Sequence, residues 1–170
     1  MPPERESDPT RVKAATTVER TSDRELVVTR TVKGPARLIF EAWTKPDLFK
    51  QWWLPKSLGM TMLSCQMDVR TGGSYRLEIS HPSAPQPMAF FGRYVEVTPH
   101  SRLVWTNEES GDAGPVTTVT FDETNGATVV VVHELYPSKE ALDAAGTGAA
   151  EAMGETFAQL EELLGSPKSR

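Results

Sequence analysis

The fold is decided by the stretch Asp68-Val69-Arg70-Thr71-Gly72-Gly73-Ser74-Tyr75-Arg76. Its glycine pair separates two strand-like segments, residues 58–69 and residues 74–79, and the second alternates apolar and polar side chains. Such alternation is typical of an antiparallel strand with one face on a core. The pair predicts a tight turn, because glycine adopts a positive φ at little cost. The alternative is that its bare backbone approaches a ligand.

Prolines and glycines divide the rest of the chain into further elements. Residues 24–32 are rich in β-branched side chains and predict a strand, and Gly34-Pro35 then begins a helix. A second short helix, which carries Trp52 and Trp53 at its end, is expected between Pro46 and Pro55. Four more strands follow the stretch quoted above, over residues 89–97, 101–107, 116–123 and 127–135.

The last two strands allow a prediction of register. Asn125-Gly126 between them is typical of a two-residue type I′ turn. Such a turn pairs Phe121 with Val130, Val119 with Val132 and Thr117 with Glu134, and cross-strand partners share a face. We therefore expect this apolar face to be the concave one, with Glu134 near one end of a pocket. The alternative for Glu134 is a solvated strand end, and His133 is expected on the opposite, outer face.

The C-terminal segment predicts one long helix, with Ser138 as its N-cap and Gly165 as its stop. Met153, Phe157, Leu160 and Leu164 recur at helical spacing and form one face. The first half is unusual, because residues 146–154 are mostly glycine and alanine. Small side chains leave volume above a sheet, which a small apolar molecule could fill. Close contact between helix and sheet, or a mobile half-helix, explains the same composition.

Composition limits the classes of function. The chain has 170 residues, which indicates one domain over residues 24–165, between a flexible tail over 1–23 and a short tail over 166–170. Residues 16–23 could drape onto the domain.

A net charge of −5 argues against nucleic-acid binding. No apolar run approaches the ~20 residues of a membrane helix, and no secretory signal is evident, so a cytoplasmic protein is expected.

Motifs for metal binding or covalent catalysis are missing from the sequence. His81, His100 and His133 are far apart, and Cys65 is the single cysteine. We therefore assign no cofactor, no metal ligand and no catalytic residue.

The order and spacing of several motifs resemble a known family. They are Arg30 with Pro35, Phe40-Glu41-Ala42-Trp43, Trp52-Trp53-Leu54-Pro55, the glycine-pair stretch, Phe91 to Val97, Pro99, Leu103, Trp105, Thr128 and Pro137 to Ala141. This pattern is similar to the helix-grip superfamily of START-related and birch-pollen-allergen-related proteins, called SRPBCC. Within it, the chain resembles bacterial relatives of the activator domain of the heat-shock-protein-90 ATPase. Many relatives carry Gly-Trp in the last helix, where this chain has Gly154-Glu155.

The resemblance implies an α+β helix-grip fold, in which a curved antiparallel sheet of about seven strands (β-α-α-β6-α) surrounds the C-terminal helix. It also implies a ligand cavity or a protein-binding sheet. Met60 and Met62 are expected on one face of their strand and Met67 on the other. Phe90 could replace Phe91, whose parity is ambiguous. The candidate ligand-binding residues are Trp53, Met60, Met62, Tyr75, Leu77, Phe91, Tyr94, Trp105, Val119, Phe121, Val132, Glu134, Met153 and Phe157.

Three functions remain open from the sequence. The first is binding of a small hydrophobic molecule that carries one or two polar groups. The second is a protein-interaction module of the chaperone-activating type, with a filled cavity and an exposed patch. The third is a cyclase- or hydrolase-like enzyme that uses a cavity carboxylate such as Glu134, which needs a raised pKa. A monomer or a homodimer is expected.

Overall fold

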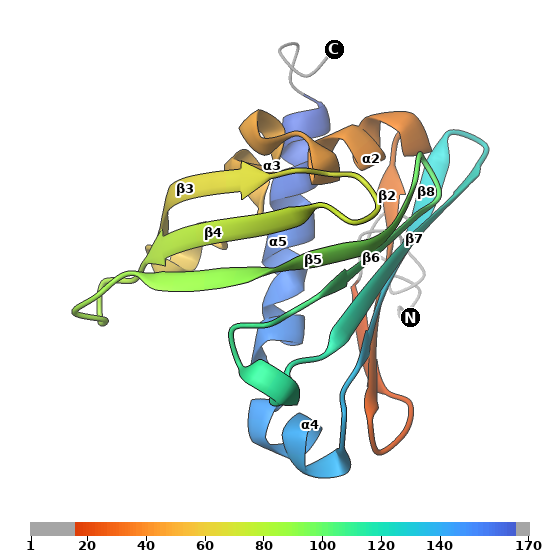
Figure 1. Cartoon of the computed structure of the whole chain (residues 1–170). Helices are drawn as coiled ribbons and strands as arrows, with labels where there is room; N and C mark the ends of the chain where they lie inside the picture. Colours follow the sequence, from red (N-terminus) through yellow and green to blue (C-terminus); the bar gives the residue numbers. More distant parts are fainter. Residues whose placement is uncertain (1–15, 166–170) are drawn as a thin grey trace, which may run out of the picture.

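The computed structural model describes residues 16–165, which form one curved antiparallel sheet and the helices that it surrounds (Figure 1). The sheet has eight strands in the order β1-β2-β8-β7-β6-β5-β4-β3. The strands are β1 (Thr17–Arg20), β2 (Glu25–Lys33), β3 (Thr61–Met67), β4 (Ser74–Ser80), β5 (Met88–Thr98), β6 (Arg102–Thr106), β7 (Val116–Thr124) and β8 (Ala127–Leu135). The helices are α2 (Ala36–Thr44), α3 (Pro46–Trp52), α4 (Lys139–Ala145) and α5 (Gly148–Leu164), with 3₁₀ turns at Lys56–Leu58 and Gly111–Ala113.

The sheet wraps around α5, as the helix-grip prediction requires. In Figure 1, α5 runs along the sheet, with α2 and α3 at its C-terminal end and α4 at the other. The buried core lies between α5 and the inner faces of the strands, and it includes Leu26, Val28, Val132, Phe157 and Leu160.

The β7–β8 hairpin has the predicted register. Thr117 pairs with Glu134, Val119 with Val132 and Phe121 with Val130. Asn125 and Gly126 have φ angles of 54° and 80°, as the type I′ turn requires. The face that carries these pairs is the buried one.

The Gly72-Gly73 pair forms a turn that joins β3 and β4 and also contacts β5. Gly72 has a φ of 89°, which favours glycine, whereas Gly73 is needed for a different reason. A Cβ atom on Gly73 would overlap the backbone carbonyl oxygen of Asp68. The Gly72 N–H donates to the carbonyl of Tyr94 (2.8 Å), and the Tyr94 N–H donates to the carbonyl of Gly73 (2.8 Å). The turn thus holds three strands together.

The methionines of β3 lie differently from the prediction. Met62 pairs with Ile79 and Ser64 with Glu78, so Leu63 is an extra residue that bulges from the ladder. A bulge reverses the alternation of side chains beyond it. Met67, which pairs with Tyr75, therefore shares the inner face with Met62. The predicted placement of Met67 on the opposite face is wrong for this reason.

The predicted single C-terminal helix is interrupted. Ser138 caps α4 as expected, and its hydroxyl accepts from the N–H of Ala141 (3.1 Å). The helix then ends at Gly146, whose φ of 69° lies in the left-handed region, and α5 begins at Gly148. Glycine at the end of a helix is a common stop. Gly146, one of the small residues in this segment, therefore marks the break between the two helices.

The N-terminal boundary also differs from the prediction. Residues 17–20 belong to the segment expected either in the flexible tail or draped onto the domain; they form β1, and β1 pairs with β2 at the edge of the sheet. This edge strand, which has few buried side chains, accounts for eight strands rather than about seven. The rest of that tail before residue 16, and the tail over 166–170, lie outside the described residues.

Arg30 fastens α5 to the sheet. It lies on the inner face of β2 and is only 5% exposed. Its guanidinium pairs with Glu161 (2.7 Å) and donates to the carbonyl of Gly154 (3.3 Å), both on α5, and to the hydroxyl of Thr16 (2.9 Å). A charge this deeply buried needs such partners. Its contacts fix the distance between α5 and the sheet.

Candidate functional site

A cavity of about 410 Å³ lies between the concave face of the sheet and α5. Most of its lining is apolar, and it comes from all parts of the fold. Leu77, Tyr94 and Val132 line it from the sheet, whereas Ala149 and Ala150 line it from α5. A well-packed protein interior has few voids larger than a water molecule. This volume is therefore the natural candidate for a ligand site.

The structure brings nine of the fourteen candidate residues to the cavity wall and leaves five away from it. Those at the wall are Trp53, Met60, Tyr75, Leu77, Tyr94, Trp105, Val132, Glu134 and Met153. Val119, Phe121 and Phe157 are buried in the packed core instead. Met62 packs at the margin of that core, and Phe91 faces outward beneath the guanidinium of Arg76. Phe90, the alternative to Phe91, lines the cavity because it pairs with Leu77.

Several lining residues were not predicted. Trp43, Asn107 and Tyr136 are the most informative, and Met67 joins them because of the bulge in β3. Trp43 belongs to the apolar stripe of α2, which gave no sign of facing a cavity. Asn107 follows β6, and Tyr136 follows β8, so strand alternation does not place either side chain.

One end of the cavity is aromatic. The ring of Trp43 packs edge-on against Trp52 (5.0 Å between ring centres) and Trp53 (5.4 Å), and tilted against Trp105 (6.0 Å). Trp52 is fully buried and donates its N–H to the carbonyl of Ala42 (2.9 Å). The buried N–H of Trp43 has no hydrogen-bond partner among the described residues. A buried donor left unpaired costs about 1–3 kcal/mol.

The segment after α3 is tied to α5, which fixes this aromatic wall. The side-chain amide of Gln159 donates to the carbonyls of Trp52 (2.9 Å) and Leu54 (2.8 Å) and accepts from the N–H of Lys56 (2.8 Å). Glu155 accepts from both the N–H and the hydroxyl of Ser57. Glu155 thus ties the turn after α3 to α5 through polar contacts.

The other end of the cavity is polar. The carboxylate of Glu134 accepts from the hydroxyls of Tyr136 (3.3 Å) and Thr117 (3.5 Å). The side-chain amide of Asn107 donates to the hydroxyl of Thr117 (2.9 Å) and to the carbonyl of Pro115 (2.9 Å). The hydroxyl of Tyr75 donates to the carbonyl of Thr106 (2.7 Å). The polar network therefore runs across β4, β6, β7 and β8.

Glu134 is the ionisable group of this network that is best placed to meet a ligand. Burial raises the pKa of its carboxyl group, and the hydroxyls of Tyr136 and Thr117 oppose that rise. Burial also raises the pKa of Tyr136 to about 12, so its hydroxyl stays protonated. The cavity wall contains no lysine, arginine or histidine among the residues that the structure describes. The carboxylate therefore has hydroxyl partners on the wall, and the charged groups that act on its pKa from outside the wall are His133, which lowers it, and Glu109, which raises it.

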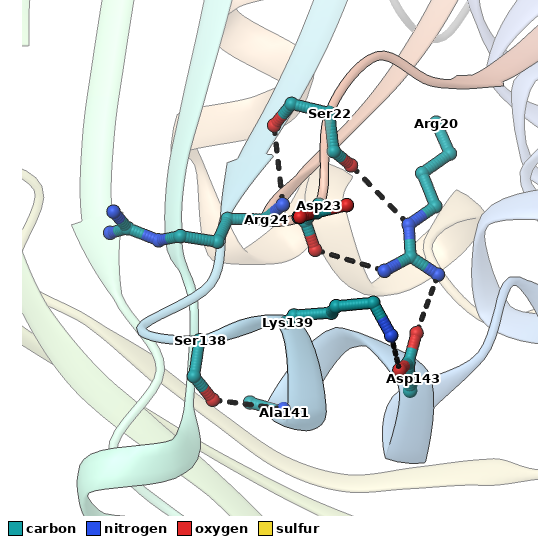
Figure 2. Close-up of polar contacts among 8 residues, drawn as sticks. All are labelled: Arg20, Ser22, Asp23, Arg24, Ser138, Lys139, Ala141 and Asp143. Atoms are coloured by element: carbon teal, nitrogen blue, oxygen red, sulfur yellow. Dashed lines mark hydrogen bonds and ion pairs between the residues drawn. The ribbon is translucent and has the colours of Figure 1, made fainter.

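α4 begins shortly after Tyr136, and its last residue, the exposed Ala145, lines the cavity. Figure 2 shows how this helix is held. Asp143 of α4 pairs with Arg20 at the end of β1 (2.7 Å) and with Lys139 (2.8 Å), and Arg20 also donates to the carbonyls of Ser22 and Asp23. Arg24 donates to the carbonyl of Tyr136 (2.8 Å). The turn between β1 and β2 thus fixes the strand end that carries Glu134 and Tyr136.

The raised pKa of Glu134 predicts a pH-dependent effect of Glu134→Gln on stability. A carboxyl group whose pKa is higher in the folded state loses stability as pH rises from its unfolded pKa through its folded pKa. Glutamine removes this cost. We expect the variant to be more stable than the parent at pH 8, by about 1 kcal/mol or roughly 2–4 °C. The advantage should shrink toward pH 4, as measured by thermal unfolding.

Glu162→Gln is the matched control for that measurement, because Glu162 is exposed near the C-terminal end of α5. It should leave the melting temperature unchanged at both pH values. Equal effects of Glu134→Gln at pH 4 and pH 8 would contradict the assignment of a partly buried carboxylate with a raised pKa.

Comparison with known proteins identifies the family and the fold. A family model described as activator of Hsp90 ATPase homolog 1-like protein matches residues 33–165. The chain belongs to this family. The match confirms the resemblance that the motifs indicated, and it covers every element from the end of β2 to the end of α5. No curated protein matches the chain significantly in sequence.

Solved structures show the same fold as this AHSA1-like chain. A crystal structure of a Rhodobacter sphaeroides protein has a TM-score of 0.79 at 22% identity, covering 88% of this chain and 98% of that one. A Nitrosomonas europaea protein has a TM-score of 0.77 at 24% identity, covering 88% and 99%. An AHSA1-like protein from Aeromonas hydrophila has a TM-score of 0.61 at 17% identity, covering 81% and 94%.

Within residues 16–165, no helix is long and apolar enough to cross a membrane. No group of three or more histidine, cysteine, aspartate or glutamate side chains in the same part of the chain is arranged to hold a metal ion.

Proposed function

We propose that this AHSA1-like protein binds a small hydrophobic molecule with one or two polar groups in the cavity between the sheet and α5. The observation that carries the proposal is the cavity itself, which is about 410 Å³ and mostly apolar, with one aromatic and one polar end. Leaving such a volume empty is costly for a folded protein. A few convergent polar groups in an apolar pocket are typical of ligand sites.

The two ends of the cavity suggest where the polar groups of a ligand lie. Glu134 supplies an acceptor at one end. The aromatic wall supplies flat apolar surface, since the unpaired N–H of Trp43 is itself buried and not exposed to the cavity. A flat apolar ligand that meets the acceptor and stacks on the aromatic wall would satisfy both the shape and the chemistry of the site.

Native mass spectrometry of freshly purified protein tests this proposal. We expect a fraction of the protein to carry an added small mass that is lost on denaturation. Protein that always has its sequence mass, and that also binds no apolar probe at high micromolar concentration, would contradict the proposal.

The protein-interaction module is the weaker candidate. It requires a cavity that is filled by side chains and an exposed apolar patch. Here the side chains leave a cavity of about 410 Å³. The exposed large apolar side chains come from β3, β5, β7, β8 and the turn before β3, and scattered apolar side chains are normal on a surface. The family description names an Hsp90 ATPase activator, so a pull-down with the bacterial chaperone is the matching test. Recovery of a complex would favour this candidate.

A cyclase- or hydrolase-like reaction is a second candidate that one observation favours. Glu134 is a cavity carboxyl group with a raised pKa, as a general acid requires. The test is to incubate any molecule recovered by mass spectrometry with the protein and with Glu134→Gln. Turnover by the parent alone would favour an enzyme, whereas unchanged release of the molecule by both would favour a binding protein.

A further inference from the structure

We propose that Glu134 selects ligands that present a hydrogen-bond donor, such as a phenol, an alcohol or an amine, and that it excludes apolar carboxylates. This inference rests on the proposed function, because it concerns the chemistry of a molecule held in the same cavity. Its basis is the set of donors and acceptors at the polar end.

The donors at the polar end are already used. Both amide hydrogens of Asn107 go to Thr117 and Pro115, and the hydroxyl of Tyr75 donates to the carbonyl of Thr106. The hydroxyls of Thr117 and Tyr136 donate to Glu134 itself. A ligand that brought another acceptor to this end would find no free donor among these groups.

Acceptor capacity, by contrast, remains. An ionised carboxylate has two oxygens and about four acceptor positions. The two bonds that Glu134 receives are long, at 3.3 Å and 3.5 Å, whereas hydroxyl-to-oxygen hydrogen bonds are usually ~2.5–3.0 Å. A ligand donor can therefore approach at a shorter distance, and hydrogen bonds to charged groups are the stronger ones.

The charge of Glu134 also disfavours a ligand carboxylate. A ligand carboxylate at this end would lie close to Glu134, and the described part of the cavity wall contains no lysine, arginine or histidine to neutralise it. Like charges repel more strongly in a poorly solvated site than in water. Elsewhere on the wall, the hydroxyl of Tyr94 could offer such a ligand a single neutral hydrogen bond, which does not compensate for the loss of solvation. A cationic amine would be attracted instead.

Three probes of matched shape test the inference by calorimetry at pH 7.5: naphthalene, 2-naphthol and 2-naphthoate. The affinity of naphthalene, which has no polar group, measures the contribution of the apolar part of the cavity alone. We expect 2-naphthol to bind about tenfold more tightly than naphthalene, because it adds one hydrogen bond to a carboxylate. We expect 2-naphthoate to bind at least about tenfold more weakly than 2-naphthol, because of its charge.

The variant Glu134→Gln assigns this preference to one side chain. Glutamine has no charge and adds an N–H donor, so the ratio of 2-naphthol to 2-naphthoate affinity should fall toward one. Glu162→Gln, which removes the same charge at an exposed site on α5, should keep the parent ratio.

The outcomes separate this inference from the proposed function. Binding of naphthalene with equal affinity for 2-naphthol and 2-naphthoate would overturn the inference and leave the binding function standing. An unchanged ratio in Glu134→Gln would do the same. Failure of all three probes to bind would count against both.

Discussion

Replacing Gly73 with alanine is expected to lower the free energy of unfolding by about 3 kcal/mol. The new methyl group would overlap the backbone carbonyl oxygen of Asp68, which cannot move without opening the turn. The same turn carries the hydrogen bonds between Gly72, Gly73 and Tyr94 that join the β3–β4 connection to β5. Chemical denaturation at neutral pH measures the effect.

Gly72→Ala is the control within the same turn. A methyl group there meets open space, and the cost comes only from the positive φ of 89°, which is worth about 1–2 kcal/mol. We therefore expect Gly73→Ala to be clearly the more damaging variant. Equal losses, or a loss below 1 kcal/mol for Gly73→Ala, would show that backbone contact does not determine this turn.

Filling the cavity from α5 is expected to weaken ligand binding strongly. Ala150 is buried and lines the cavity, so Ala150→Leu places three more carbon atoms in the space where a ligand would lie. We expect the affinity for 2-naphthol to fall by at least about tenfold, while the melting temperature stays the same or rises because a void is filled. Calorimetry and thermal unfolding measure the two effects.

Ala158→Leu makes the same change on the exposed face of α5 and should leave the affinity at the parent value. Ala149→Leu serves as a second cavity variant, because Ala149 lines the exposed part of the wall, where overpacking is less severe. Full affinity in both cavity variants, with raised stability, would contradict a ligand site beneath the first half of α5.

Much of the fold could be predicted because local signals and strand pairing agree. Asn125-Gly126 specifies one turn type, and that turn alone fixes the register that brings Glu134 to the inner face. The outward placement of His133 follows from the same register, and its ring contacts Glu25 on the neighbouring strand β2 (2.8 Å). The motifs around the glycine pair then indicated the family.

The strand faces and site residues that could not be predicted depend on features that leave no local signal in the sequence. The bulge at Leu63 changes which methionines face inward, and no glycine or proline marks it. Phe121 has the right parity but is covered by Phe40 and Trp43 of α2, whose rings pack against it. Phe157 of α5 packs on Trp52 instead, and Val119 is fully buried in the core. Asn107 and Tyr136 follow strand ends, so only the tertiary fold brings them to the polar end.

The indole N–H signals of the four tryptophans test the central claim most directly. In a ¹H–¹⁵N spectrum recorded during titration with 2-naphthol, the signals of Trp43, Trp53 and Trp105, which line the cavity, should shift. The signal of Trp52, which lies outside the lining and donates to the carbonyl of Ala42, should move least. Binding that leaves the three cavity signals unchanged, or no binding at all, would contradict a ligand site between the sheet and α5.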